Sequence, residues 1–199
     1  MSNTHKIQCR CGQLRGLLKA TRPSNRCVCY CVDCQAFARH LRAQDVLDNR
    51  GGTDIVQVPS SNLAFTQGAE NLACLRLTDK GMLRWYSTCC QTPIGNTPAN
   101  WRVSFVGLIH TCLSSENQSL DASFGPVSMR VGVENAIGPD KPAASGLLGG
   151  IAKFFAIIIK GRMGGAYRSS PFFNPQTGVP VANPKILSES ELTAARSAA

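Results

Sequence analysis

Residues 27 to 34 read C-V-C-Y-C-V-D-C and place four cysteines within eight residues. A metal that prefers sulfur gathers about four thiolates at about 2.3 Å, which leaves neighbouring sulfurs under about 4 Å apart. Alternate residues of an extended strand lie about 6.6 Å apart, so a strand would hold these side chains too far from one another. The stretch therefore predicts a metal-binding loop that contains Cys27, Cys29, Cys31 and Cys34.

The residues that follow predict a short helix over about residues 33 to 43. Phe37 and Leu41 are four residues apart, which places both side chains on one face of a helix. Asp33 lies inside the C-x-x-C motif and has two candidate roles. It caps this helix, or it accepts a proton from a metal-bound water or thiol.

The ten cysteines of this 199-residue chain favour metal ligation over disulfides. Disulfides require an oxidising compartment. The first residues, M-S-N-T-H-K-I-Q-C, contain no apolar signal-peptide core. We therefore expect a cytoplasmic location, with zinc as the bound metal.

The net charge of +9 arises from 21 Lys and Arg against 12 Asp and Glu. Such a surplus suits nucleic acid, an acidic membrane surface or an anionic small substrate. The basic residues are scattered and form no stripe with interleaved aromatics, so nucleic acid is the least favoured partner. Arg10 and Arg26 adjoin cysteines and would offset the charge of about −2 on a zinc site with four thiolates.

Two further cysteine pairs flank a region of predicted strands. Cys9 and Cys11 form a C-x-C unit, behind which Gly12 allows a tight turn. Cys89 and Cys90 are adjacent in the sequence. Residue patterns predict a hairpin formed by residues 72–77 and 82–87. They also predict three other strands, at residues 13–19, 53–58 and 63–66.

Other positions in this region carry weaker signals. The P-I-G sequence at residues 93 to 95 predicts a turn after the hairpin. Residues 101 to 112 are apolar, and their periodicity does not separate a buried strand from a helix. Cys74 lies within a predicted strand and is expected in the core. His110 and Cys112 are weak ligand candidates, which we leave outside the site.

The composition changes from residue 113, which predicts a zinc-binding domain of residues 1–112 and a C-terminal extension of residues 113–199. Residues 146–159 are strongly apolar, but they are too few to span a bilayer and include Lys153. Such a segment forms a buried helix or one that lies at a membrane interface, and we expect the first, with the helix packed on the domain or on a partner protein. Residues 171–184 are expected to form a Pro-rich loop. A short C-terminal helix is expected to start with a capping box at residues 188–191.

Three cysteine motifs in order resemble a known family. They are C-R-C-G at residues 9–12, C-Y-C-V-D-C at 29–34 and C-Q-T-P-I-G at 90–95. The pattern resembles that of the glutathione-dependent formaldehyde-activating enzymes, also called the centromere protein V family. The resemblance covers about residues 7 to 110. It implies a mainly β, Mss4-like fold of small coiled antiparallel sheets around zinc, here with a mixed C-terminal extension that contains a helix.

The resemblance also implies about two zinc ions per chain. Cys9, Cys11 and Cys90 match the residues that hold a structural zinc in the family. Cys29, Cys31 and Cys34 match those that hold a second zinc with an open position, and they would be the catalytic residues. Active members are carbon–sulfur lyases that handle adducts of formaldehyde with glutathione.

Four positions depart from the family pattern. Ser87 and Gln91 replace a cysteine and a glycine of the last motif. Cys89 is additional, and it either completes the structural site beside Cys90 or reaches the other metal. Cys27 is also additional, and it would exclude lyase chemistry if it closed the open position of the central zinc.

Two functions follow from these motifs. One is a zinc-dependent carbon–sulfur lyase acting on glutathione or other thiol adducts, with Arg26 helping to hold the substrate carboxylates. The other is a non-catalytic, zinc-stabilised interaction module. The fourth position of the central zinc separates the two. The candidate metal ligands are Cys9, Cys11, Cys27, Cys29, Cys31, Cys34, Cys89 and Cys90.

Overall fold

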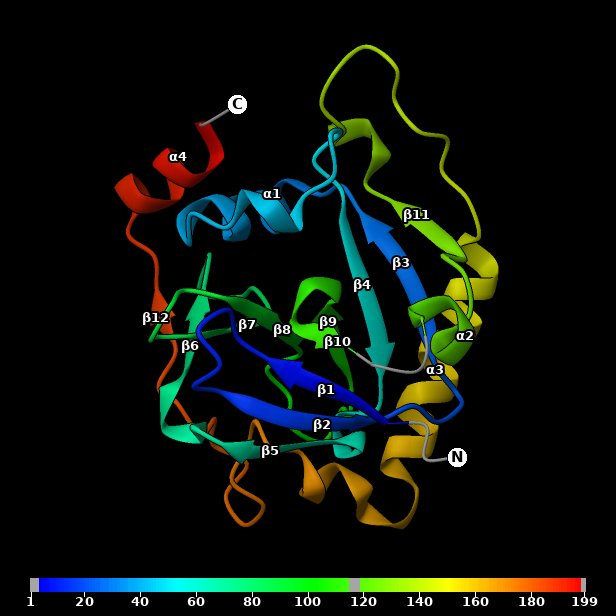
Figure 1. The fold of residues 1–199 in the computed structure, drawn as a ribbon, viewed down its shortest axis with the longest axis vertical. Coiled ribbons are helices and arrows are strands. Elements are labelled where there is room, and N and C mark those ends of the chain that lie inside the picture. The colour runs from blue at the N-terminus through cyan, green and yellow to red at the C-terminus, as the bar shows by residue number, and fades with distance from the viewer. Residues whose placement is uncertain (1–3, 115–118, 198–199) are drawn as a thin grey trace.

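The computed structural model describes residues 4–114 and 119–197. These residues form twelve strands in two sheets, together with four α-helices (Figure 1). The prediction of a mainly β fold is confirmed.

The smaller sheet has four antiparallel strands in the order β10-β1-β2-β5. Their bounds are Thr4–Gln8 for β1, Arg15–Lys19 for β2, Leu63–Gln67 for β5 and Leu113–Ser114 for β10. Strand β2 alternates exposed and buried residues, as expected of a sheet with one face in the core.

The larger sheet has eight strands in the order β11-β3-β4-β9-β8-β7-β6-β12. Its two edge strands, β11 and β12, pair in parallel with β3 and β6, and the other pairs are antiparallel. The bounds are β3 Asn25–Cys29, β4 Thr53–Val58, β6 Leu72–Arg76, β7 Leu83–Ser87, β8 Pro93–Thr97, β9 Val106–Ile109, β11 Met129–Val131 and β12 Lys185–Ile186.

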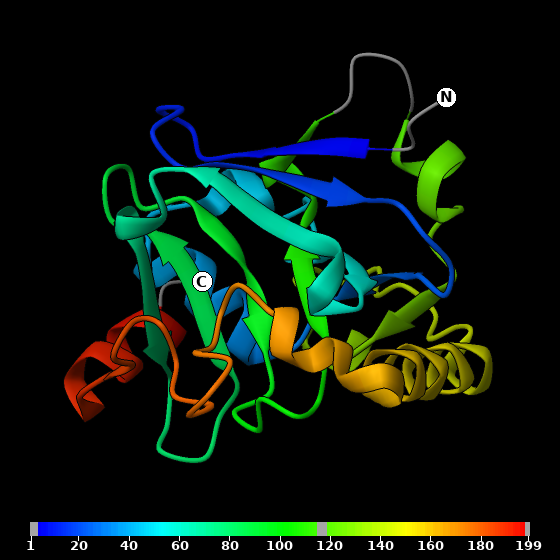
Figure 2. The same cartoon turned by 90° about the horizontal axis from the view of Figure 1, so that it is seen from below.

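Three of the four described α-helices lie at the edges or on one face of the larger sheet (Figures 1 and 2), whereas α2 packs beside β1 of the smaller sheet. Helix α1 packs beside α4, and α3 lies along β3 and β11. The α-helices are α1 Val32–His40, α2 Leu120–Phe124, α3 Leu147–Arg162 and α4 Glu189–Ser197. Short 3₁₀ segments lie at Gln44–Val46, Ser60–Asn62, Ala69–Asn71, His110–Cys112, Val133–Asn135 and Met163–Ser169. No described helix is long and apolar enough to cross a membrane.

Successive residues of the central strands serve two separate cores. Val56 and Leu108 point into a core shared with the smaller sheet, which also contains Trp85. Their neighbours Ile55 and Ile109 point into a second core, beneath α1 and α4. This alternation follows from the period of two in a strand, and it gives the molecule three layers: small sheet, large sheet and helices.

Most of the predicted strands are confirmed, including the hairpin of β6 and β7. The predicted turn at residues 93 to 95 is wrong, because these residues begin β8. A proline is tolerated at the first position of a strand. Gly95 is needed there for close packing, since a Cβ atom would lie 2.6 Å from the carbonyl oxygen of Gly107. The undecided stretch at 101 to 112 contributes strand β9.

Residues after 112 take part in both sheets through β10, β11 and β12. The Pro-rich loop also reaches the core, where the ring centroid of Phe172 lies 4.9 Å from that of Trp85 and 5.7 Å from that of Phe65. The expected capping box is present, since the Ser188 and Glu191 side chains each accept a hydrogen bond from the other's backbone N–H. The division of the chain at residue 112 stays a prediction.

Replacement of Phe172 by alanine tests whether the Pro-rich loop is part of the core. Phe172 is fully buried, so Phe172→Ala should lower the free energy of unfolding by about 3–5 kcal/mol. Chemical denaturation measures the change. Val179→Ala, an exposed position in the same loop, should change it by less than about 0.5 kcal/mol. Equal stability of the two variants would show that the loop does not contribute to the core.

Candidate metal centres

Four cysteines from two distant turns form the first group, which we name the tetrad. Their Sγ atoms all lie within 4.8 Å of one another. The Cys9 Sγ lies 3.5 Å from that of Cys11 and 3.7 Å from that of Cys89, and the Cys11–Cys89 distance is 3.2 Å. The Cys89 and Cys90 sulfurs are 3.9 Å apart. A tetrahedral metal with sulfur bonds of about 2.3 Å requires separations of about 3.8 Å, so the tetrad fits such an ion.

The N-terminal half of the tetrad sits in the turn between β1 and β2. Gly12 adopts φ +74°, as a tight turn behind the C-x-C unit requires. The backbone N–H of Leu14 donates to the Cys9 Sγ at 3.3 Å. A hydrogen bond of this kind favours the thiolate form, which binds metals.

The other half of the tetrad follows β7. Gln91 has φ +54°, a left-handed backbone conformation that is uncommon for residues other than glycine, in the turn after β7. The hydroxyl of Ser87, the last residue of β7, lies 3.4 Å from the Cys90 sulfur. Cys89 supplies the fourth sulfur of the tetrad, so the structure groups it with Cys9 and Cys11 and not with the central cysteines.

The environment of Cys90 favours its thiolate. Burial raises the pKa of this thiol, but the hydroxyl groups of Ser87 and Thr92 and contacts with Cys11 outweigh burial and lower the pKa to about 5. The Thr92 hydroxyl lies 3.0 Å from the Cys90 sulfur. Cys90 is therefore mostly ionised at neutral pH, as a metal ligand must be.

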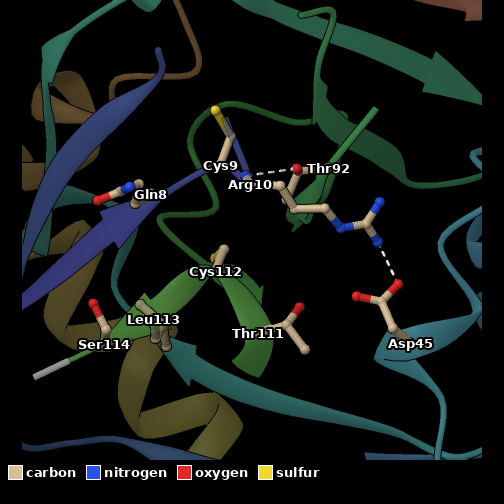
Figure 3. A pocket seen from close by; sticks show the side chains of 9 residues that line it. All are labelled: Gln8, Cys9, Arg10, Asp45, Thr92, Thr111, Cys112, Leu113 and Ser114. Atoms are coloured by element: carbon tan, nitrogen blue, oxygen red, sulfur yellow. Dashed lines mark hydrogen bonds and ion pairs between the residues drawn. The ribbon is translucent and has the colours of Figure 1, made fainter. Parts of the chain in front are cut away.

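A cavity of about 310 Å³ lies on the other side of Cys9 (Figure 3). Figure 3 shows Arg10 extended toward Asp45, with which it forms an ion pair, while its backbone N–H donates to the Thr92 hydroxyl at 3.0 Å. Asp45 thus partly neutralises the charge of Arg10, which therefore offsets less of the negative charge on the tetrad sulfurs. The other lining residues are Gln8, Thr111, Cys112, Leu113 and Ser114.

Three cysteines at the junction of β3 and α1 form the second group, which we name the triad. The Sγ atoms of Cys29, Cys31 and Cys34 lie within 4.8 Å of one another. Cys29 is the last residue of β3, and Cys31 caps the N-terminus of α1 by accepting a hydrogen bond from the Cys34 N–H at 3.4 Å. Asp33 lies in the first helical turn, so its expected role as the cap is wrong.

Cys27 stands outside the triad among the described residues. It lies in β3 two residues before Cys29, and the extended backbone separates alternate residues by about 6.6 Å. Its sulfur accepts a hydrogen bond from the Gln57 amide at 3.3 Å. Burial, followed by the charges of Cys34, Asp54 and Cys31, raises the pKa of Cys27 to about 12. Cys27 therefore remains a thiol, and the triad presents three sulfurs.

The triad sulfurs share protons when no metal is bound. Hydrogen bonds from Cys29 and Cys34 lower the pKa of Cys31 far below its usual value. The same sulfur contacts, together with burial, raise the pKa of Cys29. One thiolate is thus held by two thiols, and a metal ion must displace the remaining protons when it binds.

The triad opens onto a cavity of about 520 Å³ between the larger sheet, α1 and α3. Most of the wall is apolar, and the polar groups in it are few, as in many ligand sites. The apolar side chains are Ile55, Met82, Pro98, Phe105, Met129, Val131 and Phe154. The polar ones, apart from the cysteines, are Asp33, Gln57, Arg84 and Asn96.

Arg84 is the cation of this cavity. It is buried, its guanidinium lies 5.5 Å from the ring centroid of Phe37, and one of its nitrogens lies 3.9 Å from the Cys34 sulfur. It also lies 3.9 Å from the carboxylate of Asp33, which is paired with Arg196 at 3.0 Å. A buried cation beside thiolates stabilises their negative charge.

Sequence reasoning missed Arg84 and selected Arg26 instead. Arg26 forms ion pairs with Asp54 and Asp121 and does not line the cavity. A signal for Arg84 exists in the hairpin pattern, since it lies between Leu83 and Trp85 in a strand that is otherwise mostly apolar. A charged residue in such a strand needs a partner in the interior.

Cys74, Cys112 and His110, which are not part of the predicted site, also lie outside both groups. Cys74 is buried in β6, and Cys112 donates to the Ile94 carbonyl oxygen at 3.5 Å. The ring Nδ1 of His110 lies 3.3 Å from the Asp54 carbonyl oxygen. None of these three residues belongs to a metal-binding group in the described part of the chain.

Fold and site together define a mainly β protein with two cysteine groups that could each hold a metal ion. A family model matches residues 1–185, so the chain belongs to that family, a family of unknown function named DUF6151. No curated protein matches the chain. The crystal structure of a Rhodobacter sphaeroides protein is similar at 19% identity and a TM-score of 0.38, over 61% of this chain and 96% of that one.

Substitution of one exposed tetrad cysteine tests the metal assignment. Cys11→Ser should reduce the metal content from about two ions per chain to about one, because three ligands hold a structural metal poorly. Loss of about 3 kcal/mol of metal-linked stability would lower the melting temperature by about 6–12 °C. Elemental analysis and calorimetry measure both effects. Cys74→Ala serves as the control and should keep both ions, whereas unchanged metal content in Cys11→Ser would refute the assignment.

Proposed function

We propose that both groups bind zinc and that the triad is the reactive centre of a carbon–sulfur lyase acting on thiol adducts, such as those of glutathione. The observation that carries this proposal is that the three grouped sulfurs of the triad border a cavity. Cys27 also lines this cavity, but its sulfur lies outside the group and accepts a hydrogen bond from the Gln57 amide. Closed sites of four ligands are structural, and sites of three ligands with an open position are reactive.

The donor set supports zinc. Thiolates select soft metals such as zinc, copper(I) and iron–sulfur clusters, and tetrahedral all-sulfur sites are typical of zinc. The motifs that contain these cysteines resemble the zinc ligands of the formaldehyde-activating family. All ten cysteines are free in the structure, and a reducing cytoplasm, where we place the protein, would keep them so.

A bound zinc ion would supply an electrophile that deprotonates a coordinating thiol and holds it as a thiolate. The protein's own groups would then bind and orient the substrate. Arg84 would pair with a carboxylate of a peptide thiol, and the amides of Gln57 and Asn96 would accept and donate hydrogen bonds. The apolar wall would exclude water from the adduct.

The reaction class follows from these groups. In the cleavage of a hemithioacetal the carbon–sulfur bond breaks, and its electron pair stays on the sulfur. The hydroxyl proton of the adduct leaves to a base as the carbonyl forms, and the aldehyde departs. Asp33 is the carboxylate in the cavity wall, and its pairing with Arg196 holds it in place to receive that proton.

We also propose that residues 1–112 form an Mss4-like zinc-binding unit and that residues 113–199 complete its cavity. Both cysteine groups come from the first part. Met129, Val131 and Phe154 come from the second part and add apolar side chains to the wall, with Val131 paired to Cys29 in the sheet. This arrangement gives the extension a role in substrate binding.

Titration with glutathione tests whether the triad has an open position. In the cobalt-substituted protein, glutathione should add a sulfur ligand and change the visible absorption bands, because the thiol enters the fourth position. Cys27→Ala should respond in the same way, since its sulfur lies outside the triad. A first shell of four protein sulfurs that glutathione leaves unchanged would sink the lyase proposal and leave a non-catalytic zinc module.

Replacement of Arg84 tests substrate binding. Arg84→Gln should raise KM for the glutathione–formaldehyde adduct by about 10–100-fold, because a charged hydrogen bond is worth about 1.5–3 kcal/mol. Arg76→Gln is the matched control on the neighbouring strand, where the side chain bonds to the Gly81 carbonyl oxygen. Equal KM values for the two folded variants would remove Arg84 from the site.

A further inference from the structure

Helix α3 is held to the protein by a face with small residues. A Cβ atom on Gly150 would lie 2.2 Å from the Met129 sulfur, and one on Gly161 would lie 2.4 Å from the Ser104 Cβ. Ile157 is fully buried on the same face. The side of α3 that faces the protein is therefore fixed by close contact.

The opposite side of α3 is apolar and exposed. A row of apolar residues with four-residue spacing forms what we name the outer stripe: Leu147, Ile151, Phe155, Ile159 and Met163. Phe155, Ile159 and Met163 are 56%, 59% and 70% exposed, and the adjacent Leu148 is 86% exposed. Residues four apart are neighbours on a helix surface, so each exposed side chain of the row lies next to the following one.

This arrangement differs from that of an ordinary surface helix, because large apolar side chains also cover the outer side of α3. Such helices place apolar residues inward and charged residues outward. Here Lys153 lies toward the protein, where its ammonium donates to the Ser128 hydroxyl at 3.2 Å. Contiguous exposed apolar surface of this kind marks a site of interaction.

The segment of the chain that contains the outer stripe carries only positive charges. The sequence contains no acidic residue between Asp140 and Glu189. The basic residues of this interval are Lys141, Lys153, Lys160, Arg162, Arg168 and Lys185. Lys160 and Arg162 lie in the last turn of α3, and Arg168 lies in the 3₁₀ segment that follows. A second copy of the chain would bring like charges together on the same face, which opposes self-association.

Aromatic residues lie next to these charges. The ring centroids of Trp101 and Tyr167 are 4.9 Å apart, and both rings are partly exposed. The guanidinium of Arg102 lies 6.0 Å from the Trp101 ring, and that of Arg168 lies 5.6 Å from the Tyr167 ring. Trp and Tyr with basic neighbours are typical of the headgroup level of a bilayer.

We propose that α3 binds the surface of an anionic lipid bilayer. The outer stripe enters the boundary between headgroups and acyl chains, and the basic residues at the end of α3 contact lipid phosphates. An anionic bilayer matches both features of this surface, the apolar row and the positive rim. Figures 1 and 2 show α3 at the periphery of the fold, where a flat surface can reach it.

Vesicle flotation with the full zinc-loaded chain tests this inference. The protein should float with vesicles of phosphatidylcholine mixed with phosphatidylserine and remain unbound with phosphatidylcholine alone. The double variant Phe155→Gln/Ile159→Gln should reduce the partition coefficient at least about ten-fold, because two large apolar side chains leave the interface. Val179→Gln/Val181→Gln, at exposed apolar positions outside α3, should bind like the unmodified chain.

A second pair of variants tests the charges. Arg162→Gln/Arg168→Gln should lower binding by about 25-fold, since each basic residue near an anionic surface contributes about five-fold. Lys19→Gln/Lys80→Gln removes the same charge at exposed positions on other elements and should have a smaller effect. Circular dichroism melts establish that each variant is folded.

Three results would overturn the proposal. The first is that the protein does not bind the anionic vesicles. The second is that Phe155→Gln/Ile159→Gln binds them as well as the unmodified chain does. The third is a dimer in sedimentation velocity that this variant abolishes, with no protein bound to the vesicles. The last result would assign the outer stripe to a second copy of the chain.

Discussion

The close spacing of the cysteine sulfurs in each group constrains the backbone that carries them. Thiolates on one tetrahedral ion lie about 3.8 Å apart, which is shorter than the spacing of alternate residues in a strand. The grouped cysteines accordingly lie at strand ends and turns, as Cys29 does at the end of β3 and Cys9 does just after β1. Cys27, within β3, lies outside both groups.

The two groups lie on opposite sides of the larger sheet and have different surroundings. The tetrad borders the core between the sheets and joins the β1–β2 turn to the turn after β7. The triad borders the core beneath α1, where the N-terminus of that helix and the Arg84 guanidinium favour negative charge on sulfur. The tetrad therefore connects the two sheets, and the triad borders a cavity that Arg84 also lines.

Much of the fold is readable from local patterns. The strands at 53–58 and 63–66 alternate or are bounded by turn residues, and the short-range signal of the β6–β7 hairpin is strong. The same reasoning missed β3, whose cysteines suggested a loop, and β8, whose proline and glycine suggested a turn. In both strands the deciding interaction is pairing with a distant segment, which a local pattern does not contain.

The sequence by itself determined the chemistry of the candidate site, because cysteine spacing limits which sulfurs can share an ion. It also determined the apolar character of α3 and its basic end. Only the tertiary structure decided that Cys89 joins Cys9 and Cys11, that Arg84 rather than Arg26 lines the cavity, and that Phe172 belongs to the core. These outcomes depend on contacts between residues far apart in the chain, and such contacts are set by how the layers pack.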